Sequence, residues 1–335
     1  MARVALSHRH YPLSVARFFR AAFERLGHEV LTIGPFEPSI PWQQDTDYSQ
    51  YWDVPTIELF TAPGAASYPM ERARAEGLEA WKPDALVMID AGFHLAGGWN
   101  KVPIALVATD PHCLFGYGET AKSCNAFFVM QEHYLHRYLE GAGQAGCWPP
   151  PEWLPYCYDP QVHYWTPGVE PEYDVAFVGV LYPERERMLR ALSDAGLKVL
   201  ARQGVLYEEG TALYARAKVA LNLSSRLDLP MRFWEGLAYR RLVFTNRVPD
   251  LALLEGQGCH PYMHYIPYES TYDESKSPAA WVIPDLDDLI AKLRLYCGDA
   301  WEEEGQRIAD AGYVWVQPHT YEARAKRILE SLGVK

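Results

Sequence analysis

The feature that most constrains the fold of this chain is a repeated alternation of short β-branched runs with longer segments of helical periodicity. In the first half, a run at residues 3–7 is followed by apolar residues at helical spacing over 14–26 and by a second run at 28–33. Further strand-like runs follow at residues 85–89, 104–108 and 126–130. This alternation is typical of a parallel sheet covered by helices, so we predict an α/β fold.

The second half repeats the pattern after a proline-rich stretch. Consecutive prolines at 149–151 cannot continue a helix or a central strand, so we interpret residues 147–160 as an interdomain connection. Beyond it we expect strands at residues 173–178, 198–201, 219–223 and 242–245, and helices at 184–195, 210–217, 232–239, 286–297 and 321–332. A chain of 335 residues exceeds one ordinary core, so we predict two α/β domains.

Charge and composition exclude several classes of protein. Acidic residues outnumber basic ones by 43 to 31, and this balance opposes indiscriminate binding to nucleic acid. A local exception is the group Arg3, Arg9, Arg17, Arg20 and Arg25, which is either a solvated basic helix face or an anion site. The six cysteines form no C-x-x-C pair, so we expect reduced thiols.

No apolar stretch approaches the roughly 20 residues that span a bilayer, so we predict no membrane insertion. The N-terminus enters a strand-like run directly and lacks the pattern of a signal peptide, which predicts a cytoplasmic protein. No H-x-x-E-H, E-x-x-H or D-x-D motif stands out, and His260 and His264 lack further ligands at suitable spacing. We therefore predict no metal site.

Ordered motifs in the second half resemble a known family. They run through residues 173–179 with Arg185 just beyond, then residues 214–223, 232–238, 311–313 and 319–325. Together they resemble the C-terminal domain of GT-B glycosyltransferases, in particular the spore-maturation-protein-like branch. The first half is similar more weakly, through Thr109-Asp110-Pro111 and the Leu-Pro-x-x-x-Asp-Pro pattern of the connection.

The resemblance implies two Rossmann-like domains that face each other across a cleft, with a final helix returning to the first domain. The expected boundaries are residues 1–158 for an acceptor domain, 159–315 for a nucleotide-sugar donor domain and 316–335 for the returning helix. The donor would be a nucleoside-diphosphate sugar, with UDP as the first expectation, and no other cofactor is implied.

The donor residues follow from the resemblance and from the chemistry of a diphosphate. Gly179 ends a strand, where the absence of a side chain permits close approach, although an ordinary turn glycine is the alternative. Arg185 and Arg232 are expected on the leaving diphosphate, with surface ion pairs as the competing interpretation. Further donor candidates at strand ends are Asn222, Thr245 and Asn246.

Glu235 resembles the second glutamate of the E-x7-E pattern, which accepts hydrogen bonds from the donor ribose; a salt-bridged helix carboxylate is the alternative. The first glutamate of that pattern should occupy position 227, which is Leu227 here. The stereochemical outcome of transfer, retaining or inverting, therefore stays open.

The first half supplies the candidates for the acceptor side. Transfer requires a base near the acceptor hydroxyl, and Asp110, at the end of the run over residues 104–109, is the preferred candidate, with Asp90 and His112 next. Asp110 before Pro111 can equally form a turn. The loop after the first strand carries the candidate acceptor contacts His8, Arg9, His10 and Tyr11.

These residues predict a metal-independent glycosyltransferase that acts on a hydroxyl acceptor. The acceptor could be a saccharide, a metabolite or a hydroxymethylated DNA base; the acidic total favours the first two, and the arginines near the N-terminus keep the third open. The alternative is a noncatalytic protein that binds sugar nucleotides or acts as a scaffold on the same fold.

Overall fold

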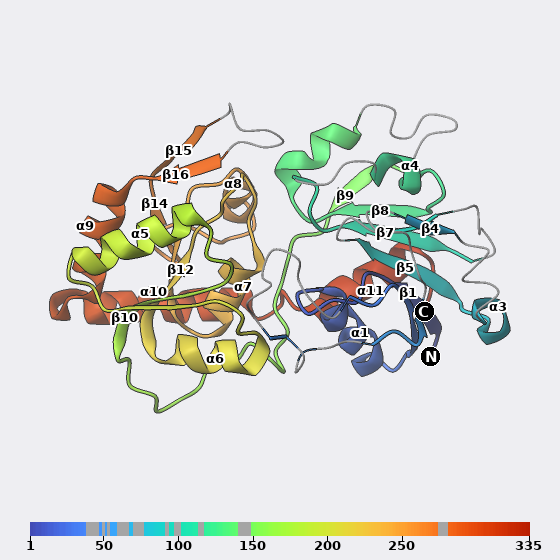
Figure 1. Cartoon of the computed structure of the whole chain (residues 1–335), viewed down its shortest axis with the longest axis horizontal. Helices are drawn as coiled ribbons and strands as arrows, with labels where there is room; N and C mark the ends of the chain where they lie inside the picture. The colour runs from blue at the N-terminus through green and yellow to red at the C-terminus, as the bar shows by residue number, and fades with distance from the viewer. Residues whose placement is uncertain are drawn as a thin grey trace. The chain divides into compact units, whose positions relative to one another are not determined.

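The chain divides into two compact units. The computed structural model describes residues 1–37, 47–48, 51, 54–58, 67–69, 77–90, 94–96, 102–112, 117–139, 149–273 and 281–335 (Figure 1). The first unit comprises Met1–Pro155 and Tyr321–Lys335, and the second comprises Tyr156–Thr320. The chain therefore passes between the units at residues 155 and 320, where the resemblance had suggested 158 and 315.

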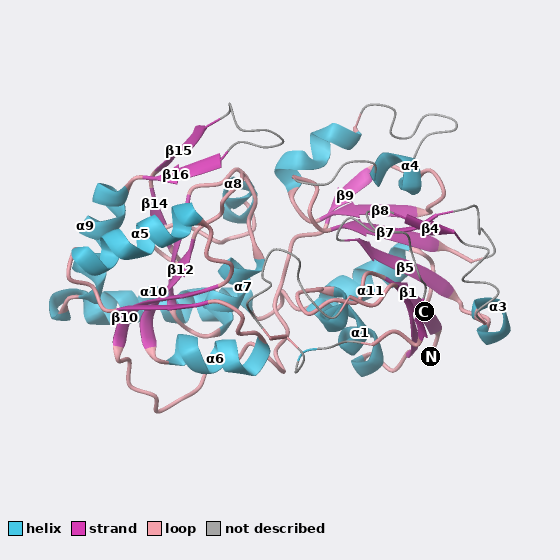
Figure 2. Cartoon of the chain, in the orientation of Figure 1, coloured by secondary structure: helices cyan, strands magenta, loops and turns pink. Residues whose placement is uncertain are grey.

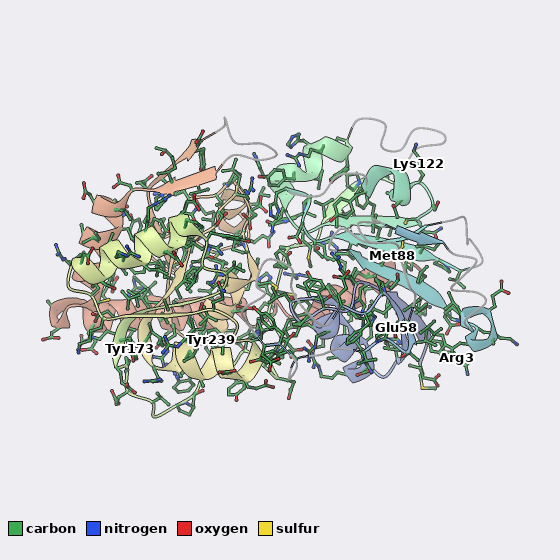
Figure 3. The ribbon with its side chains drawn as sticks, in the orientation of Figure 1. Arg3, Glu58, Met88, Lys122, Tyr173 and Tyr239 are labelled. Carbon is green, nitrogen blue, oxygen red and sulfur yellow. The ribbon has the colours of Figure 1, made fainter. Side chains whose placement is uncertain are left out.

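Across its described residues, the first unit is built on a parallel sheet in the order β3-β2-β1-β5-β7-β8-β9. Its strands are β1 (Arg3–Ser7), β2 (Glu29–Gly34), β3 (Ile57–Glu58), β5 (Ala85–Asp90), β7 (Ile104–Ala108), β8 (Ala126–Val129) and β9 (Pro151–Trp153). A small parallel pair is formed by β4 (Ser67–Pro69) and β6 (His94–Ala96). Apolar strand residues such as Met88, labelled in Figure 3, form the core.

Helices from both ends of the chain complete the first unit. The described helices are α1 (Ala16–Arg25), α3 (Leu78–Trp81), α4 (Tyr117–Ala121), the 3-10 helix η2 (Glu132–Tyr138) and α11 (Tyr321–Ser331). Tyr321, fully buried, stacks on Phe18 of α1 with ring centroids 5.0 Å apart and meets Phe19 edge-on at 5.0 Å. Arg25 and Glu322 form an ion pair at 2.5 Å. The last helix is thus an integral layer of the first unit.

The second unit is built on another parallel sheet, in the order β11-β10-β12-β13-β14. Figure 2 draws its strands in magenta and its helices in cyan. Its strands are β10 (Tyr173–Val178), β11 (Val199–Arg202), β12 (Ala217–Asn222), β13 (Leu242–Asn246) and β14 (Ile266–Tyr268). The described helices are α5 (Pro183–Asp194), α6 (Tyr207–Ala215), α7 (Met231–Ala238), α8 (Asp250–Glu255), α9 (Leu286–Cys297), η3 (Asp299–Trp301) and α10 (Glu302–Val316). An antiparallel pair, β15 (Ser270–Asp273) and β16 (Trp281–Pro284), follows β14.

Two glycines allow the helices of the second unit to pack closely. A Cβ atom at Gly236 of α7 would lie 2.8 Å from Cγ2 of Val243 and 3.1 Å from Cβ of Ala220, so α7 lies directly on the sheet. A Cβ atom at Gly312 of α10 would lie 2.6 Å from the carbonyl oxygen of His264 and 2.7 Å from Cδ2 of Leu237. Layers this close leave no room for a methyl group, so the sheet holds α7 firmly in place.

Two elements illustrate where the structure departs from the sequence-based prediction. Pro151 begins β9 although the proline-rich stretch was expected to be a connection; the proline is tolerated because β9 is an edge strand that pairs with β8 on one side. Helix α10 was not anticipated, since its acidic first turn and mixed polarity obscure the periodicity.

Among the cysteines that the structure describes, Cys124, Cys157, Cys259 and Cys297 are free thiols, and Cys113 and Cys147 lie outside the described residues. No described helix is long and apolar enough to cross a membrane.

Candidate functional site

Polar residues gather at the carboxyl edge of the second sheet. Strands β10, β12 and β13 end at Val178, Asn222 and Asn246, and all of their pairings are parallel, so these ends lie on one edge. Ligands of open parallel sheets collect outside this edge. The structure brings together here all seven residues that the sequence suggested for donor binding: Gly179, Arg185, Asn222, Arg232, Glu235, Thr245 and Asn246.

Arg232, near the start of α7, is the centre of this group. Its Nε donates to the carbonyl oxygen of Val178 at 2.8 Å, and Nη1 donates to Oδ1 of Asn222 at 3.3 Å. The guanidinium carbon lies 4.5 Å from the ring centroid of Phe177, in a cation–π contact. These contacts hold the cation across the ends of β10 and β12.

Gly179 makes room for Arg232. A Cβ atom at Gly179 would lie 2.3 Å from Nη2 of Arg232, and the residue has φ of 151°, a backbone conformation that side chains rarely adopt. The close approach expected at this glycine is therefore made by the guanidinium itself. Any substitution at Gly179 must displace the cation.

Three amide and hydroxyl side chains connect the ends of β12 and β13. Nδ2 of Asn222 donates to Oγ1 of Thr245 at 2.9 Å, and Oδ1 of Asn246 accepts from the backbone amide of Ser224 at 2.8 Å. Tyr268 donates its hydroxyl to the carbonyl oxygen of Asn222 at 2.8 Å. The Nδ2 atom of Asn246 is buried with no hydrogen-bond partner among the described residues.

Arg185 is enclosed more deeply than the sequence suggested. Its Nη1 donates to the carbonyl oxygen of Val180 at 2.9 Å and its Nη2 to that of Leu223 at 3.0 Å, and the residue is 8% exposed. Burial, with a contribution from Arg232, lowers the pKa of Arg185 to about 10. Arg185 thus ties the loops after β10 and β12 together and supplies a second positive charge from within.

Glu235 lies on α7 one turn beyond Arg232. Burial raises its pKa to about 7, although the positive charge of Arg232 acts in the opposite direction. Its Oε1 lies 3.4 Å from Nε2 of His163, a residue that the sequence-based interpretation did not select. A carboxylate that titrates near neutral pH at the ligand edge of a sheet is a functional candidate.

Two stacked tyrosines, Tyr214 and Tyr239, lie near Arg232 and Glu235. The backbone amide of Val178 donates to the hydroxyl of Tyr214 at 3.1 Å, and the rings of Tyr214 and Tyr239 stack with centroids 4.9 Å apart. Tyr239 is labelled in Figure 3. Burial raises the pKa of Tyr214 to about 12, so the phenol stays protonated at neutral pH.

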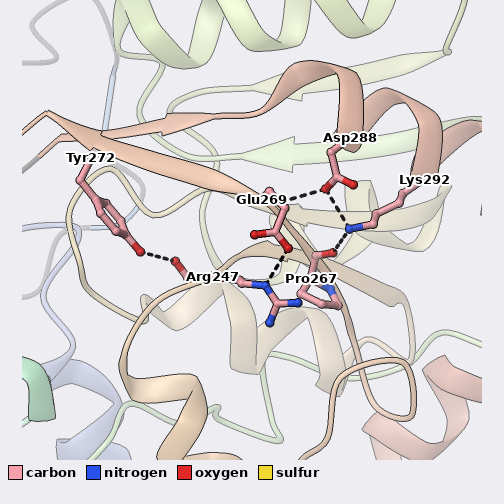
Figure 4. Close-up of polar contacts among 6 residues, drawn as sticks. All are labelled: Arg247, Pro267, Glu269, Tyr272, Asp288 and Lys292. Atoms are coloured by element: carbon pink, nitrogen blue, oxygen red, sulfur yellow. Dashed lines mark hydrogen bonds and ion pairs between the residues drawn. The ribbon is translucent and has the colours of Figure 1, made fainter.

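A surface network anchors the chain beyond Asn246 (Figure 4). Arg247 donates from Nε to Oε1 of Glu269 at 2.9 Å, and the hydroxyl of Tyr272 donates to the carbonyl oxygen of Arg247 at 3.2 Å. Asp288 of α9 accepts from the amide of Glu269 at 2.9 Å and from Nζ of Lys292 at 2.8 Å. The network fixes where the chain runs as it leaves β13.

The base candidates lie along the carboxyl edge of the first sheet. Asp90 is the last residue of β5 and pairs in register with Ala108, the last residue of β7; the structure does not describe its side chain. Asp110 follows β7 by two residues and is partly exposed. The ring of His112 lies 5.9 Å from that of Tyr134.

The four residues of the expected acceptor loop begin directly after β1. His8 and His10 are buried, at 1% and 0% exposed, and their rings approach to 3.7 Å between centroids. Arg9 pairs with Glu37 at 2.6 Å, and Tyr11 is partly exposed. Burial of both imidazoles makes them part of the packing at this edge, so Arg9 and Tyr11 are the members of the loop that reach solvent.

The described residues hold no group of three or more His, Cys, Asp or Glu side chains that could bind a metal ion.

Comparison with known proteins agrees with this geometry. Residues 166–330 match the family model described as "Glycosyl transferase-like". Sucrose-phosphate synthase from Thermosynechococcus elongatus superposes with a TM-score of 0.62 at 15% sequence identity, over 98% of each chain. The chain therefore has the GT-B fold, and its second half is similar to the glycosyl transferase-like family.

Two further GT-B structures align along nearly the whole chain. AviGT4, a glycosyltransferase involved in avilamycin A biosynthesis, gives a TM-score of 0.56 at 16% identity, over 99% of this chain and 97% of its own. WaaG, a glycosyltransferase involved in lipopolysaccharide biosynthesis, gives a TM-score of 0.55 at 14% identity, over 97% of this chain and 99% of its own. No curated protein is significantly similar in sequence. The predicted fold class is thereby confirmed, while the spore-maturation-protein-like likeness stays a prediction.

The structure adds residues that the sequence-based interpretation missed, chiefly His163 and Tyr214. His163 follows Asp159-Pro160 in the connection and is 3% exposed. The position of His163, four residues after Asp159, is a weak indication of a functional residue in the sequence, because the neighbouring Glu235 lies far away along the chain.

Proposed function

We propose that this GT-B protein transfers a sugar from a nucleoside-diphosphate sugar to the hydroxyl of a saccharide or metabolite, without a metal ion. The observation that carries the proposal is the convergence of Arg232, Asn222 and Glu235 beside Gly179 at the carboxyl edge of the second sheet. A UDP-sugar is the first donor to test.

The chemistry of this edge suits a sugar nucleotide. Arg232 and Arg185 supply two positive charges where a leaving diphosphate needs neutralisation, and Arg232 is the more accessible of the two. Glu235 offers a carboxylate to a ribose diol. Arg232 therefore takes the direct diphosphate contact in the proposal, and Arg185 supports it from behind.

The first unit would hold the acceptor, with Asp110 as the base that activates the hydroxyl. Asp110 and Asp90 follow neighbouring parallel strands, so both belong to the ligand edge of that sheet. A DNA acceptor is less favoured, because Arg3, Arg9, Arg20 and Arg25 each form an ion pair with a carboxylate. Paired arginines have less charge to offer a phosphate backbone.

Calorimetric titration with UDP, GDP and ADP tests the donor site directly. We expect Glu235→Ala to weaken binding of the preferred nucleotide by about 1.5 to 3 kcal/mol, the value of a hydrogen bond to a charged group. Glu303→Ala on the exposed face of α10 is the matched control and should bind normally. Equal affinities for Glu235→Ala and the wild type would remove Glu235 from the site.

Turnover separates the enzyme from a noncatalytic sugar-nucleotide binder. Slow release of free nucleotide from a panel of sugar donors, with water as the acceptor, is expected of a glycosyltransferase. Tight binding of the nucleotide without release of free nucleotide from any sugar donor would favour the noncatalytic alternative.

A further inference from the structure

His163 is held in place by the backbone on both sides of it. The amide of His163 donates to the carbonyl oxygen of Asp159 at 2.7 Å, and Oδ1 of Asp159 accepts from the amide of Gln161 at 2.9 Å. Oγ1 of Thr211 donates to the carbonyl oxygen of Val162 at 2.6 Å. The turn therefore holds the imidazole in a defined orientation within the second unit.

The hydrogen bonds also define which imidazole nitrogen carries the proton. The backbone amide of Asp159 donates to Nδ1 of His163 at 3.0 Å, so Nδ1 accepts and the proton of the neutral ring is on Nε2. The residue is 3% exposed, and burial lowers the pKa of His163 to about 3. The ring is therefore neutral at physiological pH.

The protonated nitrogen is directed at Glu235. Nε2 lies 3.4 Å from Oε1 of Glu235, and because burial keeps the ring neutral this is a close contact of an uncharged N–H with the carboxyl group and not an ion pair. The Glu235 side chain remains 16% exposed, so part of the carboxyl group is open to a ligand.

The groups that face Glu235 explain why a neutral donor is suitable. Arg232 is the cation that influences the carboxylate, and the phenols of Tyr214 and Tyr239 lie near it and stay protonated. The ring of Tyr239 also packs edge-on against His163, with centroids 6.0 Å apart. A second arginine in place of His163 would engage both carboxylate oxygens and weaken them as acceptors.

We propose that His163 is a positioning residue for the donor site: its neutral imidazole, with Nε2–H beside Oε1 of Glu235, restricts the carboxylate so that Oε2 faces the hydroxyl groups of the bound nucleotide. This inference rests on the proposed function, because it assigns a ligand to Glu235. His163 itself does not touch the donor. Its effect on binding passes entirely through the orientation of the carboxylate.

A pair of substitutions at position 163 tests the role. Gln places an amide N–H close to the position of Nε2, whereas Leu has similar bulk and no donor. We expect His163→Leu to raise the Kd for UDP, or for whichever of GDP and ADP the wild type prefers, by about tenfold, and His163→Gln to restore it to within about threefold. His260→Leu, at an exposed histidine of the same unit, should leave the Kd unchanged.

A double-mutant cycle distinguishes positioning from a general structural effect. In a Glu235→Gln background, His163→Leu should cost little further affinity, because the carboxylate that it orients is already gone. The pH dependence of Kd should also change: wild-type affinity should follow the ionisation of Glu235, and His163→Leu should shift that profile. Full additivity of the two substitutions would overturn the proposal.

A measurement on the wild-type protein needs no stable variant. The ¹⁵N shifts of the His163 ring should show Nδ1 unprotonated and Nε2 protonated. The opposite tautomer would overturn the inference. If the wild type binds none of the three nucleotides, the proposed function fails and this inference with it. If the wild type binds and His163→Leu binds equally well, this inference alone fails.

Discussion

At the scale of single residues, Glu235 and His163 respond to burial in opposite directions. Burial raises the pKa of Glu235 from 4.5 to about 7 and lowers the pKa of His163 from 6.5 to about 3. Both shifts favour the uncharged form, as expected in an environment of low polarity. The two residues therefore meet, 3.4 Å apart, as a pair that carries at most the carboxylate's charge at neutral pH.

The pair makes a testable contribution to stability as a function of pH. The unfolded chain ionises Glu235 near pH 4.5 and the folded chain near 7, so this contribution is lost as pH rises through that window. For His163 the folded pKa is depressed, so its contribution is lost as pH falls from 6.5 towards 3. In the wild type the two effects oppose each other where the windows overlap.

Replacing Glu235 should remove its pH-dependent contribution to the free energy of unfolding and leave that of His163. The stability of Glu235→Gln relative to the wild type should increase by up to about 3 kcal/mol as pH rises from roughly 4.5 to 7, since one pKa unit corresponds to about 1.4 kcal/mol. Denaturant unfolding of both proteins at a series of pH values measures the difference. Parallel stability profiles would contradict the raised pKa of Glu235.

At the scale of elements, α7 is the helix that builds the site. Arg232 and Glu235 are three residues apart and so lie on neighbouring positions of one helix face, while Phe233, Trp234 and Leu237 are buried. Gly236 lets this helix approach β12 and β13 directly. The same packing that forms the core therefore sets where the cation and the carboxylate lie.

Filling the contact at Gly236 should disturb both stability and the site. The new methyl group of Gly236→Ala would lie 2.8 Å from Val243, so we expect a loss of about 1 to 3 kcal/mol of stability despite the better helix propensity of alanine. Gly210 of α6 is the matched control, because its Cβ would meet nothing within 4 Å. Gly210→Ala should be neutral or stabilising by up to about 1 kcal/mol. Similar unfolding midpoints for the two variants would refute the tight packing.

At the scale of the whole molecule, the chain contributes to its first unit from both ends. After building the second unit it returns at Tyr321, and α11 packs on α1 through Tyr321, Phe18 and Phe19. Arg324 also donates from Nε to the carbonyl oxygen of Pro155, at the other passage between the units. The stability of the first unit thus depends on α11, the helix that begins where the chain returns from the second unit.

Truncation of Tyr321 tests this dependence. Removal of a fully buried aromatic ring costs about 3 to 5 kcal/mol, so Tyr321→Ala should lower the unfolding temperature of the first unit. Nucleotide binding, which we assign to the second unit, should be retained below that temperature. Val314→Ala, at a 70% exposed position, is the control. An unchanged melting profile for Tyr321→Ala would contradict the role of α11.

Local periodicity and ordered motifs were sufficient to predict much of this protein from its sequence. The bounds predicted for β1, β7, β10 and α9 agree with the structure, because spacing along the chain reports directly on strands and helices. The motifs pointed to Gly179, Arg232 and Glu235 as neighbours because strand ends in a parallel sheet share an edge.

Tertiary structure decided how those residues are used. Gly179 accommodates Arg232 itself, Arg185 is bonded to two backbone carbonyls, and His163 orients towards Glu235. None of these contacts is encoded in local spacing, because each joins segments that are distant in sequence and meet only when the helices pack on the sheet. The amino-acid sequence therefore determined the elements and the chemical groups at the edge, and long-range packing determined which group holds which.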